Sequence, residues 1–342
     1  MQVRDLVRAT EIHLVRRPQG PPVPGDFATV ARGIEVSPGE ILVRNAFLSV
    51  DPYMRGRMND GPSYVPPYQV GRVMDGGAIG RVIAAPPDSK LRPGQVVLHN
   101  LGWRDFATGP EAAFRALEPR PGLSLSTYLG ALGMPGLTAY VGLLDVARLQ
   151  SGEVVFVSGA AGAVGSVVGQ LAKLHGAGRV IGSAGSDAKV EHLLRDLHFD
   201  AAFNYKRGPV LQLLAEAAGD TGIDVYFDNV GGDQLEAALS LLNVHGRVAM
   251  CGAVSRYNAA GPMPGPNNLG LAVGKRLRLE GFLVGDHGPR RGAFLSEVGE
   301  ALSEGRLRAD ESVVDGIENM PGAFIGMLRG DNVGKMVVRV GA

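Results

Sequence analysis

The stretch from Val155 to Leu174, VFVSGAAGAVGSVVGQLAKL, predicts a β-strand, a glycine turn and a helix in direct succession. Apolar residues after the turn keep the spacing of one helix face, at Val164, Val167, Val168 and Leu171. A strand that leads through glycines into a helix is typical of dinucleotide sites, because the helix N-terminus offers backbone N–H groups to a pyrophosphate. The stretch therefore favours a nucleotide-binding α/β domain.

The glycines of this turn depart from the usual G-x-G-x-x-G spacing. Ala160 takes the first glycine position, and Gly162 and Gly165 take the second and third. The second glycine lets the backbone approach a pyrophosphate, and the third allows close packing of the helix on the strand. Alone, the motif is also compatible with a plain structural turn. The strands and helices that follow it in the sequence are needed to distinguish a nucleotide site from such a turn.

Strand-like runs continue beyond the turn and alternate with helical stretches. The runs between residues 154 and 284 are VVFVS, RVIGSAG, AFNY, VYFDNV, GRVAMCGAV and LRLEGFLV. Behind an expected N-cap at Ser186, a second helical stripe comprises Val190, Leu193, Leu194 and Leu197. This alternation predicts an α/β fold with a doubly wound parallel sheet.

The N-terminal part of the chain has a different pattern. Up to about Leu125, short apolar runs are separated by Pro and Gly, as in GEILVRNAFLSVDPY, GGAIGRVIAA and LRPGQVVLH. Such runs predict a small β barrel or sandwich. A length of 342 residues suits two domains. After Ala301 the chain mixes a helical segment with a final strand, and periodicity leaves open which domain they complete.

Composition restricts the classes of partner. Lys+Arg and Asp+Glu both number 34, so the net charge is zero and neither nucleic acid nor an anionic membrane is an expected partner. The N-terminus lacks the apolar core of a signal peptide, and no run reaches the ~20 apolar residues that span a bilayer. Cys251 is the only cysteine, which agrees with a reducing compartment. We therefore expect a cytoplasmic protein that binds small molecules.

The end of the second strand bears on the choice between NAD and NADP. NAD sites usually place an acid there to bind the ribose 2′-hydroxyl, but this chain has Ser183, Gly185 and Ser186. Asp187 follows the expected cap, where an acid also suits the helix dipole. Lys189 offers a positive charge to a 2′-phosphate, although it is equally compatible with a solvated helix position. NADPH is the predicted cofactor.

Several segments together resemble one group of the zinc-independent medium-chain dehydrogenase/reductases, namely leukotriene B4 12-hydroxydehydrogenase, prostaglandin reductase and alkenal/one oxidoreductase. In chain order the segments are FLSVDPYMRGRM, LGALGMPGLTAYVGLL, GAAGAVGSVVGQLAKL, GSAGSDAKV, FDNVGG, CGAVSRYN, GFLV and NVGKMVV. The resemblance implies a GroES-like β domain over residues 1–130, completed by 303–342, and a Rossmann NADPH-binding domain over 131–302. It also implies a homodimer.

The same resemblance implies roles for individual residues. The pyrophosphate contacts would be Gly162, Ala163, Val164 and Gly165, and the 2′-phosphate contacts Lys189 and Tyr205. The rest of the cofactor would be lined by Asn229, Cys251, Gly252, Ala253, Val254, Ser255, Tyr257, Phe282, Leu283, Val284 and Asn332. Gly159 is a departure, since members of the group often carry alanine there.

The residue content restricts the chemistry. A zinc site needs several converging ligands, and one cysteine with seven histidines at no ligand spacing predicts none. Without a Lewis acid, we expect hydride transfer to an activated acceptor, the β-carbon of an α,β-unsaturated aldehyde or ketone. Tyr257 is the first candidate to donate a proton to the carbonyl oxygen. Tyr53 and Tyr64 are further candidates by the family resemblance, and simple packing is an alternative role for all three.

Two other functions fit parts of this pattern. A quinone reductase would use the same cofactor geometry with a different acceptor. A non-catalytic nucleotide-binding protein, of the kind found among lens crystallins related to this family, would bind the cofactor without turnover. Initial rates with an enone and with a quinone separate the first alternative from the reductase. The second alternative would have a structural or nucleic-acid role; the zero net charge counts against nucleic acid, and retardation of RNA at low salt tests it.

Overall fold

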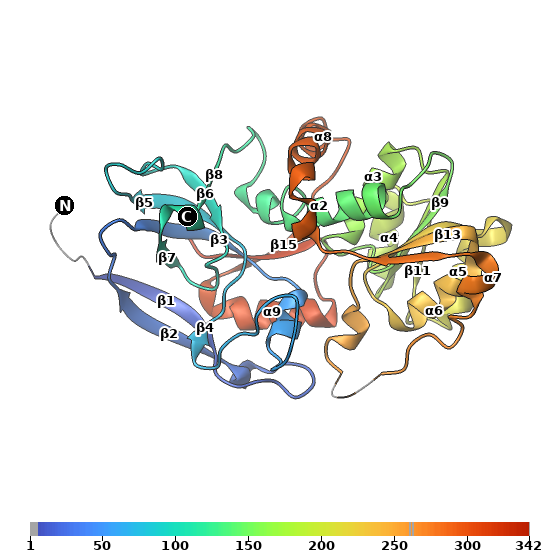
Figure 1. Cartoon of the computed structure of the whole chain (residues 1–342), viewed down its shortest axis with the longest axis horizontal. Helices are drawn as coiled ribbons and strands as arrows, with labels where there is room; N and C mark the ends of the chain where they lie inside the picture. Colours follow the sequence, from blue (N-terminus) through green and yellow to red (C-terminus); the bar gives the residue numbers. More distant parts are fainter. Residues whose placement is uncertain (1–5, 260, 262, 342) are drawn as a thin grey trace. The chain divides into compact units, whose positions relative to one another are not determined.

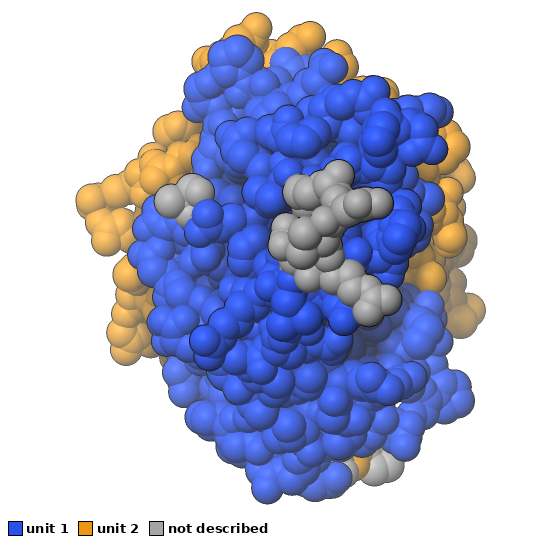
Figure 2. All heavy atoms as spheres, turned by 90° about the vertical axis from the view of Figure 1, so that its left-hand side faces the viewer, with its two compact units in different colours: residues 1–129, 312–332, 336–342 blue, residues 130–311, 333–335 orange. Residues whose placement is uncertain are grey.

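The computed structural model describes residues 6–259, 261 and 263–341 of the chain. It divides into two compact units (Figure 1, Figure 2). The first comprises Met1–Leu129, Ser312–Asn332 and Met336–Ala342, and the second comprises Gly130–Glu311 and Val333–Lys335. Residues 1–5 and 342 at the ends of the predicted first domain, and 260 and 262 in the predicted second domain, lie outside the described residues.

Residues 303–311 lie with the second unit, and so do Gly130 and Val333–Lys335, whereas the sequence-based boundaries assign all of them to the first. Two side-chain contacts hold residues 303–311 in place. The Gln170 carboxamide accepts the N–H of Arg308 at 2.7 Å and donates to the carbonyl oxygen of Arg308 at 3.0 Å. Leu307 is also buried. The segment is therefore part of the packing of the second unit.

The first unit is built from antiparallel strands. One sheet has the order β2-β1-β4, with β2 at Phe27–Ile34, β1 at Val7–Leu14 and β4 at Arg72–Val73. The other has the order β15-β16-β3-β5-β6-β8, with β7 also paired to β3. These strands are β15 Glu311–Asp315, β16 Lys335–Arg339, β3 Ile41–Ser49, β5 Ala78–Ala84, β6 Val96–His99, β8 Arg115–Leu117 and β7 Phe106–Gly109. Two helices, α1 Tyr53–Arg57 and α9 Met320–Arg329, belong to this unit.

An aromatic cluster lies in the core of the first unit. The fully buried Trp103 stacks on Phe27 at 6.0 Å between ring centroids and meets Phe324 of α9 edge to face at 5.8 Å. The C-terminal strand β16 pairs antiparallel with β3, with Val338 opposite Leu48. The chain therefore returns at its end to complete the first unit, as the family resemblance implies.

The second unit is a parallel sheet with helices along the chain between its strands. Its order is β11-β10-β9-β12-β13-β14, at Ala201–Asn204, Arg179–Ala184, Val154–Val157, Ile223–Asp228, Leu242–Met250 and Arg278–Gly281. Its helices are α2 Met134–Val141, α3 Gly165–Leu174, α4 Asp187–Arg195, α5 Val210–Ala218, α6 Gly232–Leu241, α7 Leu271–Lys275 and α8 Arg291–Ser303. The strand order reverses between β9 and β12, which is the doubly wound topology that the sequence predicts. Within the described part of the chain, no helix combines the length and apolar character needed to cross a bilayer.

The predicted helical stripes differ in outcome. In α3 the stripe is right for Val167, Val168 and Leu171, which are all buried, whereas Val164 is the N-cap of the helix and only half-buried. In α4 it is partly wrong. Leu193 is fully buried, but Leu194 is 39% exposed and Leu197 is buried only beyond the end of the helix at Arg195. The amphipathic face of α4 is therefore narrower than its spacing of apolar residues suggests.

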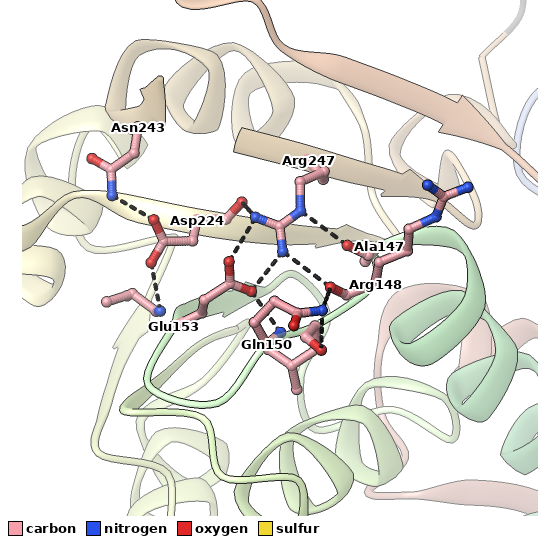
Figure 3. Close-up of polar contacts among 9 residues, drawn as sticks. Ala147, Arg148, Gln150, Glu153, Asp224, Asn243 and Arg247 are labelled. Atoms are coloured by element: carbon pink, nitrogen blue, oxygen red, sulfur yellow. Dashed lines mark hydrogen bonds and ion pairs between the residues drawn. The ribbon is translucent and has the colours of Figure 1, made fainter. Parts of the chain in front are cut away.

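A polar cluster holds the connection before β9 to neighbouring strands (Figure 3). Arg247 of β13 donates to both carboxylate oxygens of Glu153, at 2.8 and 2.5 Å, and to the carbonyl oxygen of Ala147 at 3.0 Å. Asp224 of β12 accepts the N–H of Val154 at 2.9 Å. Because these bonds join the beginning of β9 to β12 and β13, the opposite, carboxyl ends of the strands are left to carry the loops of a site.

Candidate functional site

The turn between β9 and α3 is a left-handed bend followed by close packing. Gly159 has φ +59°, so the tight bend falls on Gly159 and not on Ala160, which corrects the expectation that its glycine had been replaced. Ala160 is fully buried and its N–H donates to the carbonyl oxygen of Ser183 in β10 at 2.9 Å. A Cβ on Gly165 would lie 2.5 Å from the carbonyl oxygen of Gly159, so only glycine lets α3 begin there.

The N-terminus of α3 has the features of an anion site. No side chain among the described residues caps the helix at Val164. A Cβ on Gly162 would meet only the carbonyl oxygen of Gly159, at 3.2 Å, and no other atom outside its chain neighbours within 4 Å. The space beside Gly162 is thus left open next to an uncapped helix N-terminus. The N–H of Gly162 itself donates to the carbonyl oxygen of Gly159 at 3.0 Å. Of the predicted pyrophosphate contacts, Ala163, Val164 and Gly165 would therefore offer the N–H groups of the helix N-terminus, and Gly162 would offer the open approach to the backbone.

The tip of β10 gathers the residues predicted for a 2′-phosphate. The hydroxyl of Ser186 caps α4 by accepting the N–H of Lys189 at 3.3 Å. The N–H of Tyr205 donates to the carbonyl oxygen of Ala184 at 3.1 Å. The phenol of Tyr205 also covers Gly185, where an added Cβ would lie 3.0 Å from the hydroxyl oxygen. The structure therefore brings Tyr205 to this tip and places the Lys189 backbone in the first turn of α4.

A buried network that the sequence analysis missed shapes the loop after β12. Asp228 accepts hydrogen bonds from the Tyr226 hydroxyl at 2.6 Å and from the N–H groups of Val230 and Gly231 at 3.0 and 2.7 Å. Burial raises the pKa of this carboxyl, and these hydrogen bonds oppose the rise. An aspartate that begins a glycine-containing turn, as in FDNVGG, was the available signal.

The same loop is joined to the glycine turn through Ser158. The Asn229 carboxamide donates to the carbonyl oxygen of Ser158 at 2.8 Å, and the Ser158 hydroxyl accepts the N–H of Asn229 at 3.0 Å. Asn229 is one of the residues predicted to line the cofactor. Its carboxamide is also a structural tie between the ends of β9 and β12.

The loop after β13 lies beside the loop after β12. The N–H groups of Cys251 and Gly252 both donate to the carbonyl oxygen of Asp228, at 2.9 and 3.0 Å. Burial raises the pKa of the Cys251 thiol to about 12, and the nearby Asp228 carboxylate adds to the rise. The Tyr257 hydroxyl lies over Gly252, 3.4 Å from the position of an added Cβ. The run from Cys251 to Tyr257 therefore shares the carboxyl edge of the sheet with Asn229.

The remaining predicted residues of the second unit follow β14. The ring of Phe282 meets Phe227 edge to face at 6.3 Å between centroids. Leu283 is 43% exposed, and Val284 is the first residue of a short 3₁₀ turn. Phe282 therefore packs into the unit, while Leu283 is presented to its surface.

Three predicted residues belong to the first unit. Tyr53 begins α1, and its pKa is raised, first by burial and then by the carboxylate of Asp51. Tyr64 is 65% exposed. Asn332 lies three residues after the end of α9 and is the last residue of the segment Ser312–Asn332 of this unit. Since Tyr53 keeps its proton at neutral pH, it can act as a hydrogen-bond donor.

Among the residues that the structure describes, no three side chains of His, Cys, Asp or Glu gather as a metal ion would require. The donors described at this edge of the sheet are backbone N–H groups, hydroxyls and the Asn229 carboxamide, while the Asp228 carboxylate is already bound by the Tyr226 hydroxyl and by the N–H groups of Val230 and Gly231. This set of donors suits an anionic nucleotide better than a cation.

Comparisons with known proteins place this architecture in a family. A family model described as the N-terminal domain of oxidoreductases matches residues 10–117, and one described as a zinc-binding dehydrogenase matches residues 163–298. An NADPH-dependent curcumin reductase of Escherichia coli is 43% identical over 337 residues, which cover 96% of this chain and 95% of the relative. Prostaglandin reductase 1 of Rattus norvegicus is 41% identical over 343 residues, which cover 98% and 100%.

A solved structure agrees with these relatives. The crystal structure of CurA from Vibrio vulnificus in complex with NADPH matches with a TM-score of 0.92 and 39% sequence identity, over 97% of this chain and 99% of that chain. Both units are included in the match. On these similarities the chain belongs to the medium-chain dehydrogenase/reductase family, in the group of NADP-dependent oxidoreductases that contains curcumin reductase and prostaglandin reductase 1.

Proposed function

We propose that the protein is an NADPH-dependent reductase of the carbon–carbon double bond in α,β-unsaturated aldehydes and ketones. The observation that carries this proposal is the similarity, over nearly the full length, to two reductases whose names specify curcumin and prostaglandin. Curcumin is itself a conjugated unsaturated ketone, so an acceptor of this chemical class is the simplest common substrate.

The proposed cofactor fits the second unit. The uncapped N-terminus of α3 and the open side of Gly162 suit the pyrophosphate. Lys189 and Tyr205 would hold the 2′-phosphate beside the tip of β10, with Lys189 supplying the positive charge. Asn229, the run from Cys251 to Tyr257 and the loop after β14 would line the remainder.

When bound, NADPH would supply a hydride to the β-carbon of the acceptor and become NADP⁺, the electrons of the C=C bond would place negative charge on the carbonyl oxygen, and a proton taken up at the α-carbon would complete the saturated product. Tyr257 would stabilise that oxygen by donating its phenol hydrogen bond. Tyr53 and Tyr64 are proposed as further donors; the Tyr53 phenol is protonated at neutral pH, and burial raises its pKa further above the ordinary value. In this proposal no metal ion takes part.

Initial rates with NADPH and NADH, measured on a 2-alkenal, a conjugated ketone and a quinone, test the proposal. We expect NADPH-selective formation of the saturated aldehyde or ketone. Tyr257→Phe should lower kcat by ~10²-fold or more, the usual contribution of one hydrogen-bond donor to a developing oxyanion. Tyr128→Phe, at a buried tyrosine of the first unit, is the control and should keep its rate.

Other outcomes would identify the alternatives. Faster turnover of the quinone than of the enone would favour a quinone reductase. NADPH binding without turnover of any of the three acceptors would contradict both enzyme assignments and favour a non-catalytic nucleotide-binding protein. The family resemblance also predicts a homodimer, which light scattering on the purified protein would test.

A further inference from the structure

The first acidic residue after β10 is Asp187, which is the first residue of α4. In NAD sites an acid close to the end of this strand accepts the ribose 2′-hydroxyl. In an NADPH site the same carboxylate would repel a phosphate of like charge. The residues that bind the Asp187 carboxylate therefore bear on the preference between NADPH and NADH.

Both carboxylate oxygens of Asp187 are bound by the turn after β11. Arg207 donates from Nε to Oδ1 at 3.2 Å and from Nη2 to Oδ2, and Asn204 donates from Nδ2 to Oδ1 at 2.7 Å. These hydrogen bonds, with Arg207 the larger contributor, lower the pKa of Asp187 to about 2. The Asp187 carboxyl group is thus ionised at neutral pH, and the bidentate contact with the Arg207 guanidinium balances its negative charge.

The turn that carries Arg207 is itself well defined. The N–H of Arg207 donates to the carbonyl oxygen of Asn204 at 3.0 Å, and the N–H of Lys206 donates to the Asn204 carboxamide oxygen at 3.1 Å. Tyr205 lies in the same turn and covers Gly185. One turn therefore brings both Tyr205 and the partner of Asp187 to the tip of β10.

We propose that Arg207 is a specificity-determining positioning residue, which keeps the Asp187 carboxylate bound to the β11 turn and cancels its charge, so that this corner accepts a 2′-phosphate. The inference rests on the proposed NADPH-dependent function. Arg207 acts through Asp187 and not on the nucleotide itself. Its loss should therefore matter only while the acid is present.

Arg207 and Asp187 can be replaced with little effect on folding. The side chains of Arg207 and Asp187 are 69% and 59% exposed, and exposed ion pairs contribute little to folding stability. A matched control exists on the same helix, where Arg195 pairs with Glu191 and both side chains are also exposed, at 77% and 56%. Arg195→Ala also removes one positive charge, in this case from α4, and leaves the pair between Arg207 and Asp187 in place.

The experiment is calorimetric titration of the full-length protein with NADPH and with NADH. We expect Arg207→Ala to weaken NADPH binding by about 3- to 5-fold, the range of an exposed ion pair, while NADH binding is unchanged or tighter. Asp187→Asn should bind NADPH at least as tightly as the parent. The double variant Arg207→Ala/Asp187→Asn should match Asp187→Asn, and Arg195→Ala should match the parent.

Two results would overturn the inference alone. An unchanged ratio of NADPH to NADH affinity in Arg207→Ala would show that the ion pair has no part in selectivity. A double variant as weak as Arg207→Ala would show that Arg207 does not act through Asp187. A parent protein with no preference for NADPH would instead contradict the proposed function, so the two failures are distinguishable.

Discussion

Two glycines of the β9–α3 turn differ in what an added methyl group would meet. At Gly165 it would lie 2.5 Å from the carbonyl oxygen of Gly159, whereas at Gly162 the same oxygen is 3.2 Å away and no other atom is close. Gly165 is required for packing of the helix on the strand. Gly162 leaves space for a ligand.

These distances predict opposite effects of two alanine substitutions. Gly165→Ala should lower the free energy of unfolding by ~1–3 kcal/mol, because the backbone must move to relieve the overlap. Gly162→Ala should unfold nearly as the parent does but bind NADPH at least about tenfold more weakly, or ~1.4 kcal/mol. Urea denaturation and cofactor titration of both variants measure this difference. Equal stability losses in the two variants would contradict it.

Cys251 gives a prediction about reactivity. Burial, with a smaller contribution from Asp228, raises its pKa from 9.0 to about 12, so the neutral thiol is favoured. Because the thiolate is the reactive form, its population at pH 8 should fall by about a thousandfold relative to an unshifted thiol. Cys251 is the only cysteine, so a thiol reagent reports on it alone. We expect slow labelling of the native protein at pH 8 and rapid labelling in urea. Equal rates in both states would contradict the raised pKa of the Cys251 thiol.

At the scale of elements, the ion pair between Arg247 and Glu153 joins β13 to the start of β9 (Figure 3). Both side chains are 19% exposed, so solvent screens the pair only in part. Arg247 also satisfies the carbonyl oxygen of Ala147. The cluster thereby stabilises the edge of the sheet that lies opposite the candidate site.

Arg247→Leu should therefore lower the free energy of unfolding by ~1–3 kcal/mol, between the values for exposed and fully buried pairs. The control is Arg339→Leu, which breaks the exposed pair with Asp315 and should cost less than about 1 kcal/mol. Urea denaturation of both variants provides the comparison. A larger loss in Arg339→Leu than in Arg247→Leu would contradict the importance of the cluster.

At the scale of the whole molecule, the last strand of the chain completes the first unit. Val338 of β16 is fully buried and faces Leu48 of β3, whereas the next residue, Arg339, is exposed. The single tryptophan, Trp103, lies in the core of the same unit and reports on that unit alone. The contribution of β16 to the stability of this unit can thus be measured through the fluorescence of Trp103, which is distant from β16 only in the sequence.

Val338→Ser should lower the free energy of unfolding of the first unit by ~2–4 kcal/mol, because the core loses the two methyl groups of Val338 and a hydroxyl group is buried in their place. Arg339→Ser, one residue along, should change the stability by less than about 1 kcal/mol. The midpoint of the Trp103 emission change in urea measures both. Equal midpoints for Val338→Ser and the parent would show that β16 does not stabilise the first unit.

Local features of the site could be predicted from the sequence. The strand, turn and helix around Gly162 and Gly165, the Ser186 cap and the lack of an acid at the end of β10 all depend on neighbouring residues. Periodicity, capping and glycine freedom act over a few residues, so they can be recognised without the fold. The doubly wound sheet followed from the regular alternation of such elements.

Other features depended on contacts between residues far apart in the chain. The bend at Gly159 depended on where β9 ends, and the tie between Ser158 and Asn229 joins two strand ends 71 residues apart. The pairing of Arg207 with Asp187 required β11 to lie beside β10.

The sequence by itself therefore determined the order of the elements, the α/β class of the second unit and the glycine turn, because these depend on local conformational preferences. Only the tertiary structure decided that β16 pairs with β3, that residues 303–311 stay with the second unit and that Arg207 binds Asp187. The physical reason is that strand pairing and side-chain partners are selected by burial and hydrogen bonding across the folded chain, which no local pattern encodes.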